Sequence, residues 1–91
     1  MVKQRLDKWL YFARAVKSRS LAQKLIAAGA VRVNSAREVR TDCPIAEGDV
    51  LTMTVHSRLL VWRVLSLGER RGPPAEARTL YEDLSPEVPR G

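Results

Sequence analysis

Apolar residues in the first third of the chain recur at helical spacing in two separate runs. In residues 5–16 the spacing is i, i+3, i+4 and i+7, which places one buried stripe along an amphipathic helix. Residues 19–28 repeat this spacing, and Gly29 follows where a left-handed C-terminal cap is expected. The two stripes consist of Leu6, Trp9, Leu10, Ala13 and Val16 in the first run and Leu21, Ala22, Leu25 and Ile26 in the second. The pattern therefore predicts two consecutive helices.

Two serines compete for the capping position at the start of the second helix. A cap at Ser18 places Arg19 at the first helical position. A cap at Ser20 would instead form a capping box with Gln23, three residues later. The hydrophobic pattern alone does not choose between these two registers.

Beyond residue 30 the period of the pattern shortens to two, which indicates strands. Val31 and Val33 alternate with a polar residue, a turn is expected at 34–37, and the return strand at 38–40. Residues 50–56 alternate in the same way, and residues 59–67 form a longer apolar run. The intervening "HSR" is expected to join these two strands as a hairpin, although it lacks the usual Asn-Gly turn signal.

The last quarter of the chain begins with the pattern break "GERRGPP" at 68–74. A short helix is expected after it, with Pro74 near its first position and a face of Ala77, Leu80, Tyr81 and Leu84. Residues 85–91 are expected to be a frayed tail. The whole pattern predicts an α+β fold, in which two N-terminal helices pack on a small antiparallel sheet and a short C-terminal helix follows. We divide it into a main domain, residues 1–67, and a C-terminal part, residues 68–91.

Charge changes this picture, because it is concentrated in the N-terminal half. The chain carries a formal net charge of +6. Residues 1–40 hold ten Lys or Arg and two acids, whereas residues 41–91 hold six Arg and eight acids, so the halves carry +8 and −2. Such asymmetry favours a polyanionic partner, nucleic acid or an anionic membrane, over a basic surface kept for solubility.

Several classes of function are disfavoured by what the sequence contains. Cys43 is the single cysteine and His56 the single histidine, so neither a disulfide framework nor a zinc site is expected. No nucleophile–base pair can be placed, and we expect no catalysis and no cofactor. The sequence has no apolar run of the ~20 residues that a membrane span needs, and its start does not read as a secretory signal. We therefore expect a cytoplasmic protein. Binding to a membrane surface is not expected either, because the cationic helices lack a wide exposed apolar face.

Three ordered motifs carry a resemblance to a known family. They are "RLDKWL", "KSRSLAQKLIAAGAVRVN" and "EGDVL", within residues 5–55. Together they resemble the RNA-binding domain named after ribosomal protein S4, also called the αL motif, which we place at residues 1–67. The segment "RRGPPAEARTLYEDL" resembles the part that follows this domain in the bacterial heat shock protein fifteen family. Short members of that group linked to ribosome-associated quality control are similar in length.

The resemblance implies a protein that binds structured RNA, and we expect it to be non-enzymatic and monomeric. The implied targets are ribosomal RNA of the large subunit and tRNA on subunits that carry stalled nascent chains, with no small-molecule substrate. Two features depart from the family. Ser35 stands where the family usually has Gly, so the turn at Asn34-Ser35 is expected to differ in type. Longer heat-shock members also have a basic C-terminal extension, whereas this chain ends at residue 91.

Candidate RNA-binding residues cluster where the two helices meet. Lys17 and Arg19 flank the start of the second helix, whose free N–H groups and positive dipole end suit a phosphate, and Ser18 can cap the helix or donate to phosphate. The resemblance favours Ser18 as the cap. The other candidates are Arg5, Lys8 and Arg14 from the first helix, Lys24 from the second, and Arg32, Asn34 and Arg37 from the sheet edge.

Other conspicuous residues have a structural interpretation. Trp9 and Trp62 are expected in the core, Cys43 is expected to be inert, and His56 is taken as a strand residue. Arg70 and Arg71 fit a second RNA contact and a solvated turn equally well. Two alternative functions remain: a DNA-binding regulator, since two short helices can mimic a helix-turn-helix, and a module that assists a separate RNA-modifying enzyme.

Overall fold

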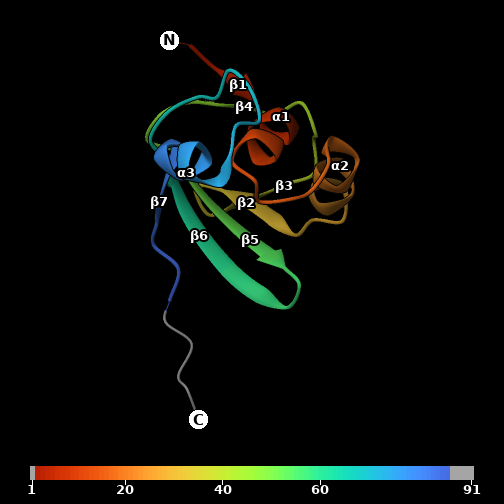
Figure 1. Cartoon of the computed structure of the whole chain (residues 1–91). Helices are drawn as coiled ribbons and strands as arrows, with labels where there is room; N and C mark the ends of the chain where they lie inside the picture. Colours follow the sequence, from red (N-terminus) through yellow and green to blue (C-terminus); the bar gives the residue numbers. More distant parts are fainter. Residues whose placement is uncertain (1, 87–91) are drawn as a thin grey trace.

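A computed structural model of the chain describes residues 2–86 and shows helices packed over a twisted antiparallel sheet (Figure 1). The helices are α1 (Leu6–Phe12), α2 (Arg19–Ala27) and α3 (Pro74–Ala77), with a 3₁₀ turn at Arg78–Leu80. The strands are β1 (Gln4–Arg5), β2 (Val31–Val33), β3 (Ala36–Glu38), β4 (Pro44–Ile45), β5 (Val50–Val55), β6 (Arg58–Val64) and β7 (Tyr81–Asp83). The α+β fold class is therefore confirmed.

The main sheet has the order β3-β2-β5-β6-β7, and every pairing in it is antiparallel. A second, two-stranded sheet pairs β1 with β4. Alternation along β5 works as predicted: Leu51 and Met53 are fully buried, whereas Thr54 is exposed. In Figure 1, α1 lies over this sheet, with α2 on one side of it and α3 on the other.

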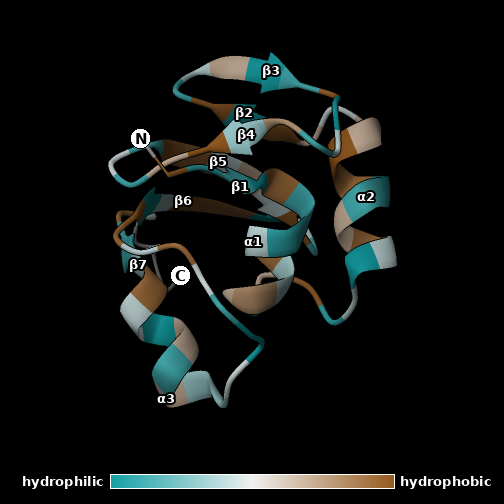
Figure 2. Cartoon of the chain, turned by 90° about the horizontal axis from the view of Figure 1, so that it is seen from above, coloured by the Kyte–Doolittle hydropathy of each residue, from teal (hydrophilic) through white to brown (hydrophobic). Residues whose placement is uncertain are grey.

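The core lies between α1, α2 and the inner face of the sheet. Figure 2 shows hydrophobic ribbon in β5 and β6 where they run beside α1. Both tryptophans belong to this core, as predicted: Trp9 meets Trp62 edge to face with ring centroids 6.4 Å apart, and its Nε1 donates to the Ser66 carbonyl at 2.9 Å. The buried cluster consists of Leu6, Trp9, Leu10, Phe12, Ala13, Ala22, Ile26, Val31, Ile45, Leu51, Met53, Trp62, Val64 and Leu80.

The first helix is shorter than the predicted 5–16 at both ends. Arg5 is an extended residue of β1 that precedes the helix, and α1 ends at Phe12. Arg14 has a φ of +61° and stops the helix, with the Arg14 N–H bonded to the Tyr11 carbonyl and the Ala15 N–H to the Leu10 carbonyl. This is the Schellman arrangement, in which Gly is the usual residue at the left-handed position. An arginine there gave no stop signal in the sequence.

The second helix matches the prediction closely. Ser18 is its N-cap: the side-chain oxygen accepts from the Leu21 N–H at 3.2 Å, so Arg19 occupies the first helical position. The alternative capping box does not form, because Ser20 lies inside the helix and the Gln23 side chain donates to Asp7. Gly29, with a φ of +79°, closes the helix in the left-handed conformation that was expected.

The two tight hairpins were both predicted, but their turns are shorter than expected. Asn34 and Ser35 have φ values of +50° and +74°, the two positive angles that a type I′ turn requires. The expectation that Ser35 would change the turn type is therefore wrong, and the return strand starts at Ala36 rather than at residue 38. His56 and Ser57 form an equivalent two-residue turn between β5 and β6, so His56 is a turn residue.

The C-terminal segment is only partly helical, which corrects the expected helix over 74–84. Pro74 is at the start of α3 as predicted, but Tyr81 to Asp83 form β7 and pair with β6. The reason is tertiary: the Tyr81 ring stacks on Trp62 with centroids 3.7 Å apart, which favours the strand. Ser85 then accepts from the Val61 N–H at 2.8 Å, so the ordered chain continues there. The rest of the predicted tail, residues 87–91, lies outside the described residues.

Candidate nucleic-acid interface

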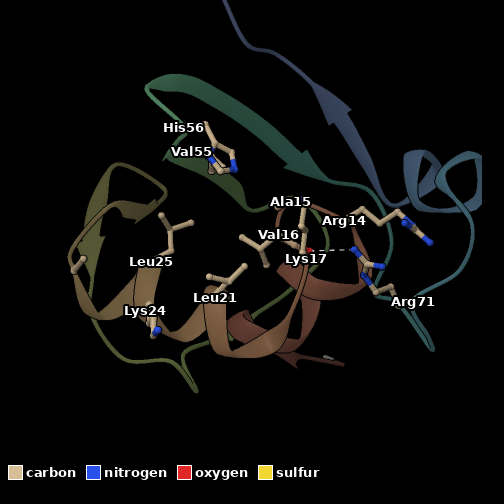
Figure 3. Close-up of a pocket in the computed structure, with 11 residues that line it drawn as sticks. Arg14, Ala15, Val16, Lys17, Leu21, Lys24, Leu25, Val55, His56 and Arg71 are labelled. Atoms are coloured by element: carbon tan, nitrogen blue, oxygen red, sulfur yellow. Dashed lines mark hydrogen bonds between the residues drawn. The ribbon is translucent and has the colours of Figure 1, made fainter.

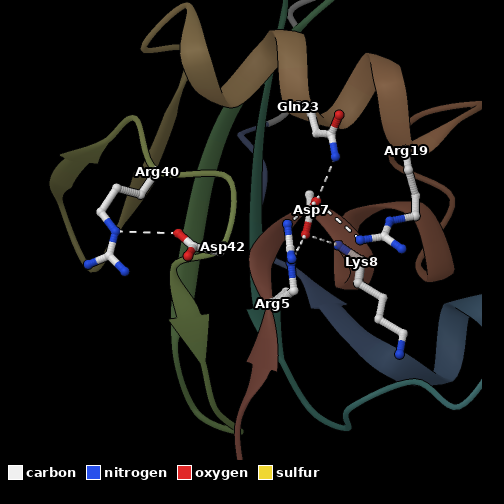
Figure 4. Close-up of polar contacts among 7 residues, drawn as sticks. All are labelled: Arg5, Asp7, Lys8, Arg19, Gln23, Arg40 and Asp42. Carbon is white, nitrogen blue, oxygen red and sulfur yellow. Dashed lines mark hydrogen bonds and ion pairs between the residues drawn. The ribbon is translucent and has the colours of Figure 1, made fainter.

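A buried carboxylate, Asp7, organises the junction of α1 and α2. Arg5 binds it with two parallel hydrogen bonds, Nε to Oδ1 and Nη2 to Oδ2, both 3.1 Å. From α2, Arg19 Nη2 reaches Oδ2 at 3.3 Å and Gln23 Nε2 reaches it at 3.1 Å (Figure 4). The backbone N–H of Lys8 donates to Oδ1 at 2.8 Å. Five donors thus satisfy a carboxylate that is fully removed from solvent.

The hydrogen bonds keep this carboxylate ionised. Burial alone would favour the protonated acid, but hydrogen bonds from Arg5, Gln23 and Arg19 outweigh it and hold the pKa of Asp7 below its usual range. The contact with Asp7 also raises the pKa of Arg5, and the hydrogen bond between the two side chains is the largest cause. Asp7 is therefore a fixed negative charge that locks two arginines in place.

The cations around Asp7 remain available to a ligand, because only part of each is used. The Arg5 and Arg19 side chains are 49% and 44% exposed, and each guanidinium has five N–H donors. Lys8 lies beside them and is exposed, with its ammonium 5.6 Å from the Phe12 ring. We call Arg5, Lys8 and Arg19 the cation cluster. The three cations and the one buried carboxylate together have a net charge of +2.

The loop after β3 borders the cation cluster. The N–H groups of Leu6 and Asp7 donate to the carbonyls of Cys43 and Thr41, which holds this loop against the start of α1. Arg40 and Asp42 form an exposed ion pair of 3.4 Å in the loop, and Figure 4 shows them beside the cluster. Arg40 was not among the predicted site residues, because a lone arginine in a turn carries no sequence signal.

Two predicted members of the site lie elsewhere on the helix. Residues 19 and 23 are one turn apart and share the face of α2 that meets Asp7. Lys24 shares the opposite flank with Leu21, and Lys17 precedes the helix on that same side (Figure 3). The structure therefore divides the predicted patch between two faces, with Arg19 on one and Lys17 and Lys24 on the other.

Arg14 and Arg71 hold the C-terminal segment against the end of α1. Arg14 Nε donates to the Gly72 carbonyl at 2.7 Å. Arg71 donates to the carbonyls of Tyr11 and Val16, and its guanidinium lies 4.9 Å from the Tyr11 ring centroid. Arg70 pairs with Glu76 at 3.1 Å on the surface. Arg71 thus has a structural role, which differs from both roles that the sequence suggested, an RNA contact and a solvated turn.

The three predicted residues at the sheet edge have two different roles. Arg32 and Arg37 face each other across β2 and β3, both exposed, and Arg37 extends over Gly29, where a Cβ would lie 3.3 Å from its Cδ. Asn34 is exposed, but its side-chain amide bonds to neighbouring residues of the chain: Nδ2 donates to Asp49 at 3.2 Å and Oδ1 accepts from the Val50 N–H at 2.9 Å. Asn34 therefore fixes the hairpin to β5.

The described residues show no other chemical centre. Within residues 2–86 no group of three His, Cys, Asp or Glu side chains could hold a metal ion, and no helix there is long and apolar enough to cross a membrane. Burial and a hydrogen bond with Glu38 raise the pKa of Cys43 to about 11, so this thiol is protonated at neutral pH. That agrees with the inert role predicted for Cys43.

Comparison with known proteins gives the class to which this site belongs. Residues 4–40, which contain Asp7 and the cation cluster, match the family model of the S4 domain. The match runs from β1 through β3, so this part of the chain is similar to an S4 domain. The resemblance inferred from the sequence motifs is confirmed.

Relatives along nearly the whole chain are heat shock protein 15 sequences, and the chain is homologous to them. The Escherichia coli K12 protein is 34% identical over 87 residues, which cover 96% of this chain, and the Haemophilus influenzae homologue is 31% identical over 92% of it. The chain spans 65% and 63% of the length of these two relatives. The trimeric structure of Vibrio cholerae heat shock protein 15 superposes with a TM-score of 0.84 at 29% identity, over 90% of this chain and 82% of that one.

Proposed function

We propose that this protein binds structured RNA through the cation cluster and acts as an RNA-binding adaptor on the large ribosomal subunit. The observation that supports the proposal most is the Asp7 network, because it fixes two half-exposed arginines on one carboxylate and leaves some of their N–H donors free for a phosphate. The cap at Ser18 leaves further N–H groups at the start of α2 for the same anion. The S4 domain match and the heat shock protein 15 relatives support the choice of RNA.

Such a surface recognises RNA through its shape and backbone. A-form helices hide the base edges of their deep major groove, so phosphates and 2′-hydroxyls are what three exposed cations can contact. Arg32 and Arg37 extend the proposed contact along the sheet edge. Ribosomal RNA, and tRNA on subunits with stalled chains, are the RNAs that the resemblance implies. We propose a cytoplasmic, non-enzymatic protein; its monomeric state stays a prediction, whereas the Vibrio cholerae relative is trimeric.

The alternative of a DNA-binding regulator is weaker. A recognition helix needs free side chains for base edges, and Gln23, a main candidate reader on α2, is bound to Asp7 at 3.1 Å. A competition assay between duplex DNA and structured RNA compares the two classes directly. If the purified protein modified RNA, the non-enzymatic function proposed above would be wrong.

Co-sedimentation in a sucrose gradient tests the ribosomal proposal. The wild-type protein should migrate with large subunits at low salt and remain at the top at high salt, because phosphate contacts are screened. Lys8→Glu should stay at the top even at low salt. Arg78→Glu is the matched control, since Arg78 is exposed in the 3₁₀ turn and lies outside the proposed surface. Co-sedimentation of Lys8→Glu at the wild-type level would place the RNA site elsewhere.

A further inference from the structure

A groove of about 710 Å³ lies between α2, the segment that joins it to α1, and the end of β5 (Figure 3). Its floor is aliphatic and its edge is basic. We call it the hairpin groove, because the turn at His56 forms one wall. The apolar lining consists of Ala15, Val16, Leu21, Leu25, Ala28 and Val55, and the polar edge of Arg14, Lys17, Lys24, His56 and Arg71.

The groove exposes a helix face that has the pattern of a buried one. Positions 21, 25 and 28 lie on one side of α2 at the i, i+4, i+7 spacing of a packing stripe, yet Leu21 is 45% exposed. The core of the domain uses the neighbouring stripe of Ala22 and Ile26, which are fully buried. The predicted apolar stripe of this helix therefore has two parts: one is fully buried, and the other is half-buried against the core at Leu25 but exposed at Leu21 and Ala28.

The charge of the groove specifies the chemistry of an occupant. No acidic side chain lines it, and within residues 2–86 Lys17 and Lys24 take part in no ion pair. Arg14 and Arg71 donate to backbone carbonyls, which do not neutralise them. A ligand that fits must bring carboxylates or phosphates for the edge and apolar groups for the floor.

The aliphatic floor favours protein over RNA. Proteins that hold unstacked bases do so on Phe, Tyr, Trp or Arg planes, and no aromatic ring other than that of His56 lines this groove. Valine and leucine side chains instead suit the leucine or isoleucine anchors of an amphipathic helix, which binds grooves through residues at i, i+3, i+4 and i+7.

We propose that the hairpin groove binds an acidic amphipathic helix of a partner protein, with apolar anchors against Leu21 and Leu25 and carboxylates at Lys17 and Lys24. This goes beyond the proposed RNA function. Arg19 and Leu21 point to different flanks of α2, so RNA on the cation cluster and a helix in the groove can be held together. The protein would then join an RNA to an acidic partner.

Fluorescence anisotropy with a labelled synthetic peptide tests the proposal. The probe carries leucines at i, i+3, i+4 and i+7 and glutamates elsewhere, and a second peptide has serines in place of the leucines. The wild type should bind the leucine peptide, and Leu21→Asp should weaken this binding at least about tenfold through lost apolar contact and like charge. Val39→Asp introduces the same charge at a 55% exposed valine outside the groove, and should bind as the wild type does.

Four outcomes would overturn the proposal. They are absence of peptide binding, equal binding of the serine peptide, wild-type affinity in Leu21→Asp, and displacement of the peptide by saturating ribosomal RNA. Self-association that is lost in Leu21→Asp, measured by sedimentation, would make a second copy the occupant and also overturn it. Ribosomal RNA binding by Leu21→Asp should equal that of the wild type, which separates this test from the RNA proposal. If Leu21→Asp lowers the helical circular dichroism signal, Leu21→Gln replaces it in the assay.

Discussion

Asp7 connects the folding of this protein to its proposed activity. A buried carboxylate is costly unless it is paired and hydrogen-bonded, and here the partners are arginines from the two sides of the helix junction. Those same arginines carry the proposed phosphate contacts. Folding of the junction and placement of the cation cluster are therefore one event, and Asp7 acts as a positioning residue for both arginines.

Replacing Asp7 by Asn should remove a pH-dependent part of the stability. The folded-state pKa of Asp7 lies below its unfolded value, so its contribution is complete above pH about 4 and is lost as pH falls through the folded pKa. At pH 7, Asp7→Asn should unfold with about 1.5–3 kcal/mol less free energy in urea titrations. The gap should shrink in acid. An equal gap at pH 7 and pH 3 would contradict the ionised network.

At the level of single residues, the sequence predicted which cations lie together at the helix junction better than how they are held there. Arg5, Lys8 and Arg19 were expected at the site, and the structure places them together. The burial of Asp7 was not expected, because acids are almost always exposed and its α2 partners are 12 and 16 positions away. Periodicity reports which side of a helix is apolar, but it does not report a polar group that is buried between two helices.

The two hairpins of this fold depend on tight turns whose residues have a strained backbone conformation. In both hairpins two consecutive non-glycine residues have positive φ, Asn34 with Ser35 and His56 with Ser57. Asn34 compensates through its side-chain bonds to Asp49 and Val50. Ser35 has no such compensation among the described hydrogen bonds of its side chain, so it stores part of the cost of the turn.

Ser35→Gly should therefore stabilise the protein. At a φ of +74° glycine relieves the Cβ clash, and the gain should be about 0.5–1 kcal/mol in the free energy of unfolding. Urea denaturation of the purified variant measures it. The control is Ala36→Gly, in β3, which should lower stability because a strand residue gains backbone freedom. A destabilised Ser35→Gly would show that the serine makes a contact that the turn needs.

Prediction of whole elements succeeded where a pattern was long and failed where tertiary contacts decide. Helix α2 and strands β5 and β6 have clear periods and were predicted within a few residues. The end of α1 at Phe12 depends on Arg14 in a left-handed conformation, held by Gly72 from far along the chain. Likewise β7 forms because the Tyr81 ring stacks on Trp62. No local signal in "TLYEDL" indicates this contact.

On the scale of the whole molecule, α2 separates two surfaces. One flank carries Arg19 and belongs to the cation cluster, and the other carries Leu21 and Lys24 and belongs to the hairpin groove. The sequence showed a single basic N-terminal half with a net charge of +8. The division of that charge between two faces follows from the helical repeat once the packing stripe of Ala22 and Ile26 is known.

The salt dependence of ribosomal RNA binding tests the central claim, that the cation cluster contacts phosphates. About four phosphate contacts in all, three from the cation cluster and one from the sheet-edge arginines, should give a wild-type slope of log K against log salt of roughly −3 to −3.6. The double variant Arg5→Gln/Arg19→Gln keeps donors for Asp7 but removes two charges, so its slope should be shallower by about 1.5–2. The matched control Arg63→Gln/Arg78→Gln removes two charges from β6 and the 3₁₀ turn, and should keep the wild-type slope. An unchanged slope in Arg5→Gln/Arg19→Gln, with its folding intact by circular dichroism, would contradict the claim.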